Sequence, residues 1–324
     1  MTDSPTPTVG ANREALFALV GLVRAELRRR GEPLAADWVD QAVEDLARGE
    51  LPGYYYAPDD PPGGLGFLSP AGGRAYGHVH VEPGPRGPER AQRLVEALCA
   101  DLAPAVQRAD FGLSGLSSTE EGFLTRNLVA RGGEVIARQA LERPLAPGDG
   151  NSEVTAPAGT HHAKTEVVDL ESLVDLDRRA FADTPDASLI AETPEEHRRV
   201  LREIFGGRLG TFLPEASTVL LDDAGRPVAA VLAAEETPHR AVLHDLVVDP
   251  ARTRRGLGGY LLRWVFRALW ARGYSMVGLW VTETNRPARA LYDLNGFVLR
   301  TTATIYRWVR PAPTVAAAHP QTSR

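Results

Sequence analysis

The chain has 324 residues, a length that suggests two domains of roughly 150 residues each. Its composition, 43% hydrophobic and 24% charged, is that of a soluble globular protein, and no apolar run approaches the roughly 20 residues of a membrane span. A net charge of −6 disfavours a general nucleic-acid binder. The N-terminus lacks the basic and apolar regions of a secretory signal, and Cys99 is the single cysteine, so we expect a cytoplasmic protein without a disulfide.

The N-terminal half contains one strand, turn and helix in clear succession. Residues 76–98 follow the order strand, Val-x-Pro, turn and amphipathic helix, with Val81-Glu82-Pro83 closing the strand. The helix is expected over 89–102, where Cys99 lies on the apolar stripe as a buried thiol.

A boundary is expected at residues 146–164, where proline, glycine and small polar residues interrupt all periodicity. We interpret this stretch as a linker between domains at 11–145 and 165–311. The first ten residues and residues 312–324 are expected to be disordered. His161 and His162 lie in the linker without a further ligand cluster nearby in the sequence, so no metal site is expected.

The C-terminal half has stronger periodicity. Its apolar runs and turn signals predict five strands and three helices before the last motif. In chain order these are a strand at 164–169, helices at 170–181 and 193–205, a hairpin at 217–236, a strand at 241–248, a helix at 260–272 and a strand at 275–282.

The most informative stretch is 247–262, VVDPARTRRGLGGYLL, which places a glycine-rich turn between an apolar strand and an amphipathic helix. Unpaired backbone N–H groups at a helix start carry the positive end of the helix dipole, and glycines let a ligand approach them closely. Two arginines add charge. The turn is therefore expected to hold a phosphate or pyrophosphate; it consists of Arg254, Arg255, Gly256, Leu257, Gly258 and Gly259.

Two familiar phosphate loops do not fit these residues. A P-loop requires Lys-Ser or Lys-Thr after its glycines, and neither dipeptide follows here. A dinucleotide fingerprint starting at Gly256 requires glycine at position 261, where Leu261 stands.

The stretch instead resembles motif A of the GCN5-related N-acetyltransferase (GNAT) superfamily, whose [RQ]-x-x-G-x-[GA] loop holds the pyrophosphate of acetyl-CoA. Gly256 and Gly258 fall on the motif glycines, while Thr253 replaces the usual Arg or Gln. A second segment, 285–297, resembles the family's N-x-x-A-x-x-[LF]-Y-x-x-x-G-F pattern. The residues that match it are Asn285, Ala288, Leu291, Tyr292, Gly296 and Phe297.

The resemblance covers about residues 165–311 and implies an α+β (three-layer) fold with a mixed, splayed sheet. It implies acetyl-CoA as co-substrate, with the pantetheine amides paired to the strand before the glycine turn. The residues expected to bind it are Leu246, Val247, Val248, Arg254, Arg255, Gly256, Leu257, Gly258, Gly259, Asn285 and Tyr292.

The resemblance also assigns chemical roles. Tyr292 would protonate the departing thiolate, and a backbone N–H near Val248 would stabilise the oxyanion. Strand alternation puts His244 on one face with Leu246 and Val248, so it is the expected base, whereas Asp245 would point oppositely unless a bulge intervenes. Glu283 is the alternative base.

The N-terminal order at 76–98 resembles the same motif in damaged form. Aligning Val81 with Val248 puts Glu89 and Ala91 on the motif glycines, and a carboxylate there would repel pyrophosphate. Residues 124–135 resemble the tyrosine helix, but Leu128 replaces the tyrosine. We expect a tandem GNAT protein with a degenerate N-terminal copy, the alternative being an unrelated α/β domain.

The expected function is acetyl-CoA-dependent N-acetylation of a primary amine on a small molecule or protein, by direct transfer. Mycothiol synthase, also a tandem member with an inactive N-terminal half, gives one alternative, and a non-catalytic CoA-binding protein gives another. Neither nucleic acid nor membrane is an expected partner, and a monomer or homodimer is expected.

Overall fold

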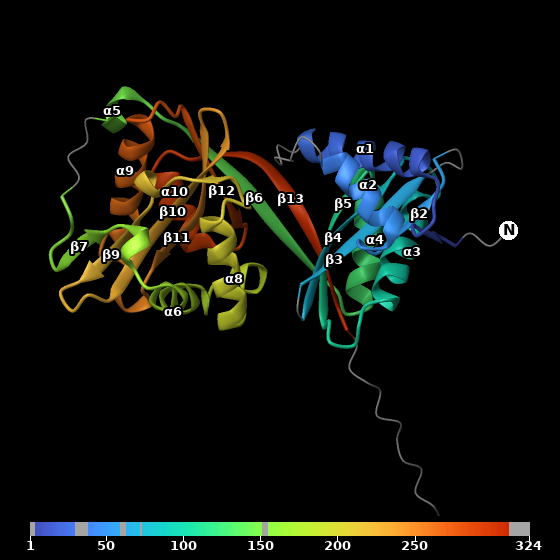
Figure 1. Ribbon diagram of the computed structural model, residues 1–324, viewed down its shortest axis with the longest axis horizontal. Helices are drawn as coiled ribbons and strands as arrows, with labels where there is room; N and C mark the ends of the chain where they lie inside the picture. The colour runs from blue at the N-terminus through green and yellow to red at the C-terminus, as the bar shows by residue number, and fades with distance from the viewer. Residues whose placement is uncertain (1–3, 30–37, 59–62, 72, 151–154, 311–324) are drawn as a thin grey trace, which may run out of the picture. The chain divides into compact units, whose positions relative to one another are not determined.

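The structure is a computed structural model that describes residues 4–29, 38–58, 63–71, 73–150 and 155–310. The chain divides into two compact units. One, here called the N-terminal unit, comprises Met1–Ile136 and Thr304–Arg324; the other, the C-terminal unit, comprises Ala137–Ala303. Figure 1 colours the chain along its length.

The C-terminal unit is built on a mixed sheet with the strand order β6-β12-β11-β10-β9-β7. β11 and β12 are parallel, the other neighbours are antiparallel, and the short β8 also pairs with β10. The bounds are β6 Glu134–Pro144, β7 Thr160–Ala163, β8 Thr211–Phe212, β9 Thr218–Asp222, β10 Pro227–Thr237, β11 Arg240–Val248 and β12 Met276–Thr282.

Helices cover both faces of this sheet. One core joins α6 (Leu170–Phe181) and α8 (Pro194–Phe205) to the sheet, and a second core joins α9 (Leu257–Trp270) and α10 (Arg286–Leu294) to the opposite face. Two short helices, α5 (Pro147–Gly150) and α7 (Ala187–Ile190), complete the unit. The predicted start of α8 is confirmed, since Thr193 and Glu196 form a capping box.

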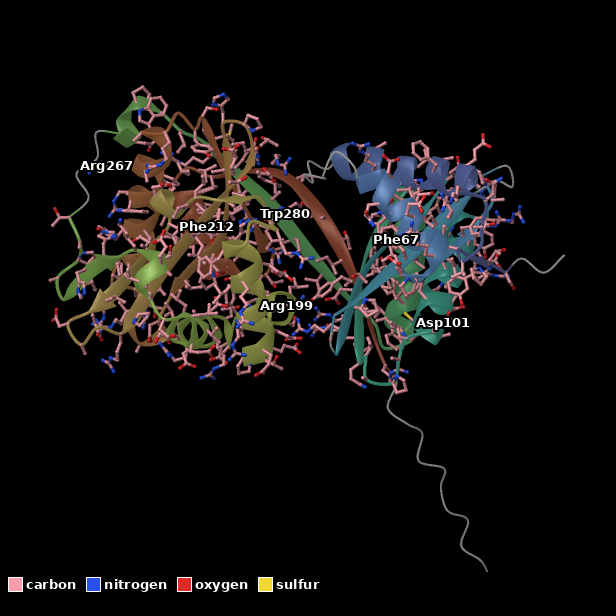
Figure 2. All side chains as sticks on the ribbon, viewed as in Figure 1. Phe67, Asp101, Arg199, Phe212, Arg267 and Trp280 are labelled. Atoms are coloured by element: carbon pink, nitrogen blue, oxygen red, sulfur yellow. The ribbon has the colours of Figure 1, made fainter. Side chains whose placement is uncertain are left out.

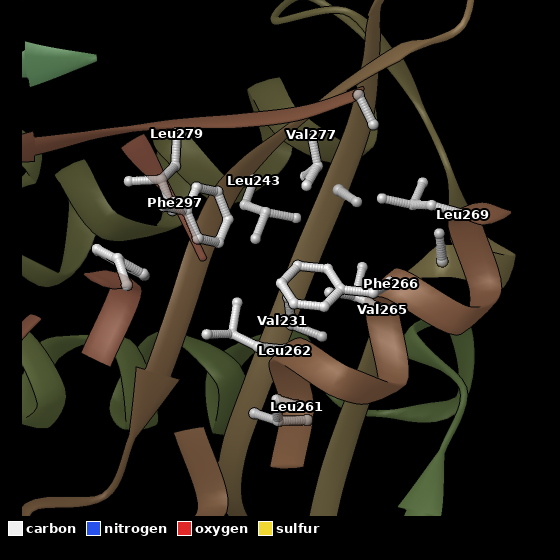
Figure 3. Close-up of a cluster of buried hydrophobic side chains, with 14 of the residues drawn as sticks. Val231, Leu243, Leu261, Leu262, Val265, Phe266, Leu269, Val277, Leu279 and Phe297 are labelled. Carbon is white, nitrogen blue, oxygen red and sulfur yellow. The ribbon is translucent and has the colours of Figure 1, made fainter. Parts of the chain in front are cut away.

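The apolar stripe of α9 forms the centre of the larger core (Figure 3). Leu261, Leu262, Val265 and Leu269 are all fully buried, and Figure 3 shows them beside side chains from the strands. The predicted amphipathic helix is therefore confirmed, and burying its apolar stripe fixes α9 against β10 and β11. The start of α9 is held in place by this packing.

The N-terminal unit repeats the same topology. Its strand order is β1-β2-β3-β4-β5-β13, with β4 and β5 parallel and the other neighbours antiparallel. The bounds are β1 Thr6–Pro7, α1 Arg13–Arg29, α2 Trp38–Arg48, β2 Gly53–Tyr56, β3 Gly64–Ala71, β4 Arg74–Val81, α3 Gly87–Ala100, β5 Arg108–Ser114, α4 Ser118–Ala130 and β13 Val298–Val309. The expected tandem fold is present, and the alternative of an unrelated α/β domain is wrong.

The domain boundaries differ from those expected, because two strands carry the chain between the units. β6 follows the N-terminal helices in sequence, yet residues 138–144 pair with β12 of the C-terminal unit. β13 follows α10, yet residues 305–309 pair with β5 of the N-terminal unit. The division therefore falls inside β6 and inside β13 rather than at 146–164.

Several local expectations also need correction. The stretch expected as a linker contains α5 and β7, and β7 pairs with β9. The strand expected at 164–169 is wrong, since Thr165–Val167 is a single 3-10 turn. Thr6–Pro7 forms a strand within the expected disordered N-terminus, while residues 1–3 and the expected tail 312–324 lie outside the described residues. No helix in the described ranges has the length and apolarity to cross a membrane.

Candidate functional site

The two parallel strands of the C-terminal unit separate part-way along their length. β11 and β12 pair only from Arg240 with Met276 to Leu243 with Leu279. Beyond that point β11 still pairs with β10 as far as Val248, and β12 still pairs with β6 as far as Thr282. The splayed sheet expected from the resemblance is therefore present, with an opening beside residues 244–248.

A β-bulge in β11 marks the start of this opening. Leu232 and Ala233 of β10 pair with Asp245 and Leu243, so His244 is the extra residue. Leu243 and Leu246 both pack on the α9 side, which breaks strict alternation.

The expectation that His244 shares a face with Leu246 and Val248 is wrong for that reason. The bulge turns His244 and Asp245 together towards α6 and α8, where Val247 is also buried. A bulge is not visible in the residues themselves, because AVLHDLVV fits a regular strand equally well.

Two backbone amides of β11 point into the opening. The N–H of Asp249 donates to the carbonyl of Val228 on β10 at 2.8 Å, which fixes the alternation of the strand. Val247 therefore directs its backbone groups to β10, while Leu246 and Val248 direct theirs away from it. These two residues present N–H and C=O groups at an edge where an extended amide chain can pair.

The glycine turn lies directly after this edge. Gly256 caps α9 with a φ of +80°, a left-handed conformation that favours glycine, and Arg254 is also left-handed at +59°. The first N–H groups of α9 have no partner within the helix. Arg254 and Arg255 are exposed and form no ion pair with another described residue, so the turn presents donors and positive charge to solvent.

The expected cofactor residues in this turn have different physical roles. A Cβ on Gly258 would lie 2.9 Å from Cδ2 of Leu291, so this glycine lets α9 and α10 pack closely. A Cβ on Gly259 would meet nothing closer than 3.5 Å. Leu257 is buried in the core and can contribute only its backbone.

Tyr292 lies on α10 and is 9% exposed. Its ring meets that of Phe297 edge to face, with centroids 5.6 Å apart. Burial raises the pKa of its hydroxyl, Asp186 and Asp245 raise it further, and Arg138 opposes them. No described residue hydrogen-bonds to the hydroxyl, so Tyr292 is a neutral proton donor available to a ligand.

A buried hydrogen-bond network holds the N-terminal end of α10. Asp186 accepts hydrogen bonds from the N–H and hydroxyl of Thr282, at 3.0 and 2.7 Å, and from Nδ2 of Asn285, at 2.7 Å. Arg138 of β6 lies 3.6 Å from the same carboxylate. Oδ1 of Asn285 also caps α10 through the N–H of Ala288. The side chain of Asn285 is thus engaged in holding the helix that carries Tyr292.

The two candidate bases lie in different surroundings. Nε2 of His244 contacts the carbonyl of Leu209 at 2.7 Å, which leaves Nδ1 as the basic nitrogen. Burial lowers the pKa of His244, against the opposing effects of Leu209 and Glu236. Glu283 is exposed and accepts a 3.4 Å hydrogen bond from Gln139. His244 is therefore a neutral imidazole, whereas the side chain of Glu283 is exposed to solvent.

Sequence reasoning missed a buried acidic cluster behind the bulge. Nδ1 of His197 lies 2.5 Å from Oδ2 of Asp177, and both side chains are 2% exposed. Burial raises the pKa of Asp177 to about 7, and burial beside Asp177 raises that of Asp245. The three residues of the cluster, Asp177, His197 and Asp245, are far apart in the chain. The one feature of the sequence that could have indicated the cluster is Asp245, a charged residue within the apolar run 241–248.

His162 of the expected linker also forms specific contacts. Its Nδ1 lies 2.9 Å from the hydroxyl of Thr218, and its Nε2 lies 2.5 Å from that of Tyr260. The ring stacks on Trp264. These contacts attach β7 to α9.

Comparison with known proteins assigns the fold. A model of the acetyltransferase (GNAT) family matches residues 171–297, which lie wholly within the C-terminal unit. A mycothiol acetyltransferase from Thermobispora bispora is 30% identical over 264 residues, 80% of this chain and 80% of that protein. The chain belongs to the acetyltransferase (GNAT) family. A mycothiol acetyltransferase from Clavibacter sepedonicus is 28% identical over 307 residues, 90% of this chain and 92% of its own.

Solved structures show the same fold over both units. A GCN5-related N-acetyltransferase from Sphaerobacter thermophilus covers 94% of this chain and 95% of its own, with a TM-score of 0.64 at 21% identity. A tandem GNAT protein from the clavulanic acid biosynthesis pathway covers 95% and 98%, with a TM-score of 0.57 at 16% identity. The protein is an N-acyltransferase with a tandem GNAT fold.

The two GNAT copies differ at the opening. In the N-terminal unit β4 and β5 stay paired as far as His80 with Ser114, so the strands do not separate. The hydroxyl of Ser114 lies 2.7 Å from Nε2 of His78 and 2.9 Å from Nδ1 of His80. A Cβ on Gly115 would fall 1.8 Å from the carbonyl of Val81. No slot for an added chain exists between these strands.

The N-terminal copy also lacks the glycine turn, but the residues that replace it are not those expected from aligning Val81 with Val248. Three residues lie between Pro83 and the start of α3 at Gly87, whereas six lie between Pro250 and the start of α9 at Leu257, so the N-terminal turn is three residues shorter. The expected match of Glu89 and Ala91 to the motif glycines is therefore wrong, since the helix starts align Arg86 with Gly256 and Pro88 with Gly258. Arg86 holds the capping position.

Proposed function

We propose that the C-terminal unit transfers an acetyl group from acetyl-CoA to a primary amine, by direct attack of the amine on the thioester. The observation that carries the proposal is the opening between β11 and β12 beside the glycine turn of α9. The same fold in the N-terminal unit has neither feature. The chemistry is accordingly assigned to one unit.

The opening supplies complementary groups for an acyl-CoA. The backbone of Leu246 and Val248 can pair with the amides of pantetheine as a neighbouring strand would. The N–H groups from Arg255 to Gly259 suit a pyrophosphate, because they lie at the positive end of α9. A free N–H near Val248 can donate to the thioester oxygen, where negative charge develops during attack.

Proton transfers follow from the two titratable groups beside the opening. As the amine nitrogen bonds to the carbonyl carbon, the carbon–sulfur bond breaks and the sulfur takes a proton from Tyr292. The amine loses a proton to Nδ1 of His244, and Tyr292 is then reprotonated from solvent. Tyr292 suits its role because its pKa is raised, and His244 suits its role because its pKa is lowered, so both begin uncharged.

An amine precursor of mycothiol is the second candidate acceptor. The mycothiol acetyltransferases that resemble this chain do so over most of its length, across both units. A pocket of about 310 Å³ at the end of α8, lined by Phe205, Phe212, Thr165 and Glu166, offers aromatic and carboxyl groups to such an amine. The rings of Phe205 and Phe212, the latter labelled in Figure 2, meet edge to face at 5.1 Å.

Release of free thiol from acetyl-CoA against a panel of amines tests the proposal. The panel should include the amine precursor of mycothiol, simple alkylamines and a lysine peptide. Thiol release that depends on one of these amines is the expected result. Binding of acetyl-CoA without amine-dependent release from any of them would favour a non-catalytic CoA-binding protein.

A further inference from the structure

A cavity of about 500 Å³ lies beside the turn that precedes α9. Its walls come from the end of α6, the hairpin between β9 and β10 and the residues after β11. Six charged side chains line it, namely Arg179, Arg226, Arg252, Arg255, Asp222 and Asp249. Four arginines against two aspartates leave an excess of two positive charges.

The first aspartate orients two of the arginines. Asp222 is 4% exposed, and its carboxylate accepts the N–H groups of Ala224 and Arg226, both at 3.0 Å. It also accepts guanidinium hydrogen bonds from Arg226 and Arg252, both at 2.9 Å. The backbone and side chain of Arg226 lower the pKa of this carboxyl, so it stays ionised and holds both guanidinium groups in place.

The second aspartate holds a third arginine. Asp249 accepts the N–H of Ala251 at 2.9 Å and the guanidinium of Arg179 at 3.1 Å. A guanidinium group has five N–H donors, and each of these pairs uses only one or two of them. Arg255 forms no ion pair with any described residue. The cavity is therefore lined by fixed donors that remain available.

We infer that this cavity is a second anion site, suited to a phosphate monoester attached to a larger group. A dianion matches the two excess charges, and arginine forks are the groups that bind phosphate with defined geometry. The volume exceeds that of one phosphate, so part of the attached group can enter as well.

The site is continuous with the glycine turn. Arg255 both lines the cavity and begins the run of N–H groups proposed to hold pyrophosphate. A ligand anchored in the turn is therefore within reach of the cavity. The inference rests on the proposed function only in naming two sources of the phosphate: the 3′-phosphate of CoA, or a phosphate on the acceptor.

The test for the site itself uses the full chain and inorganic phosphate, so it does not depend on turnover. Gly259→Glu places a carboxylate in the first turn of α9, where a Cβ has room, and should prevent phosphate from binding in the turn. In that background phosphate should still raise the melting temperature with saturation. Adding Arg226→Gln should weaken this binding by about tenfold, the loss of one charge-assisted hydrogen bond.

The control is Arg267→Gln, which removes one positive charge from the last turn of α9; Arg267 is labelled in Figure 2. It should leave phosphate binding unchanged. Absence of phosphate binding in Gly259→Glu, or equal binding with and without Arg226→Gln, would overturn the inference.

A second measurement needs no change to the turn and distinguishes the two sources. If CoA supplies the phosphate, the chain should bind CoA about tenfold more tightly than 3′-dephospho-CoA, and Arg226→Gln should remove that difference. If the acceptor supplies the phosphate, CoA and 3′-dephospho-CoA should bind alike, both to the unchanged chain and to Arg226→Gln. Binding of inorganic phosphate should still depend on Arg226. If Arg226→Gln changes neither the preference for CoA over 3′-dephospho-CoA nor the binding of inorganic phosphate, the site is contradicted.

Discussion

At the scale of single residues, the environment of Tyr292 decides what it can do. A hydroxyl that is buried and faces Asp186 and Asp245 resists ionisation, so it is a proton donor and not a nucleophile or base. Arg138 opposes these carboxylates, which limits how poor an acid Tyr292 becomes. A tyrosine placed only for packing would not need a free hydroxyl within this charged surrounding.

Tyr292→Phe should slow thiol release by about a hundredfold, the usual contribution of a general acid, and should leave the affinity for acetyl-CoA nearly unchanged. Thiol release and calorimetric binding measure the two quantities separately. Tyr274→Phe is the matched control, because Tyr274 is also buried but hydrogen-bonds to Glu235. Equal rates for Tyr292→Phe and the unchanged protein would reduce Tyr292 to a packing residue.

The pH dependence of kcat/KM should identify the base. A base must be unprotonated, so activity should fall as pH decreases through its pKa. Burial lowers the pKa of His244 below 6.5, which places the acid limb below pH 6.5. His244→Gln should remove that limb and most of the activity. A limb near pH 7 that survives His244→Gln would instead assign the proton to the cluster around Asp177, whose pKa is raised to about 7.

The same cluster should make stability depend on pH. The pKa of Asp177 rises from 3.8 to about 7 on folding, so its stabilising contribution is complete below about pH 4 and is lost as pH rises through 7. Asp177→Asn cannot ionise and should lose less stability than the unchanged protein between pH 5 and pH 8. Melting temperatures at both pH values test this, with exposed Asp175→Asn on the same helix as control. Identical slopes for both variants would be inconsistent with a buried acid.

At the scale of elements, the sequence predicted best where the periodicity was strong. The apolar stripe of α9 and the apolar runs of β10 and β11 determine their own structure, and each lies where expected. The bulge at His244 and the cluster around Asp177 could not be predicted, because each depends on which residues of other elements face β11. The alignment of the turn before α3 with the turn before α9 was wrong, because neither the helical nor the strand period of apolar residues determines the length of a surface turn.

The glycines of the α9 turn provide an element-scale test. Gly256 has a φ of +80°, so Gly256→Ala should lower the free energy of unfolding by about 1 kcal/mol. Gly259 lies within the helix with room for a Cβ, so Gly259→Ala should raise it by about 0.5 kcal/mol. Urea unfolding of the pair measures both changes. The same sign for both substitutions would mean that the turn has another conformation.

At the scale of the whole molecule, the crossing strands limit what sequence can predict about domains. A composition change at 146–164 looked like a boundary, but β6 lies before it and completes the later sheet. Seven residues of β6 pair with β12, and Arg138 among them lies beside Asp186. Strand exchange leaves no local signal, because a strand has the same pattern whichever sheet it joins.

A fragment of residues 165–311, the domain expected from the sequence, should therefore fail to unfold cooperatively. It lacks β6 and β7, which exposes the edges of β12 and β9 and leaves Asp186 without Arg138. A fragment of residues 134–311 restores both and should melt in one transition. Calorimetry compares the two fragments, and equal cooperativity would show that β6 and β7 are dispensable.

We expect that one unit of this tandem GNAT protein binds acetyl-CoA and that the other does not. Isothermal titration of the full chain with acetyl-CoA measures the number of molecules bound and their affinity. We expect one molecule bound per chain and at least tenfold weaker binding in Gly259→Glu, whose added carboxylate repels the pyrophosphate. Two molecules bound per chain, or a single site that Gly259→Glu leaves intact, would contradict it.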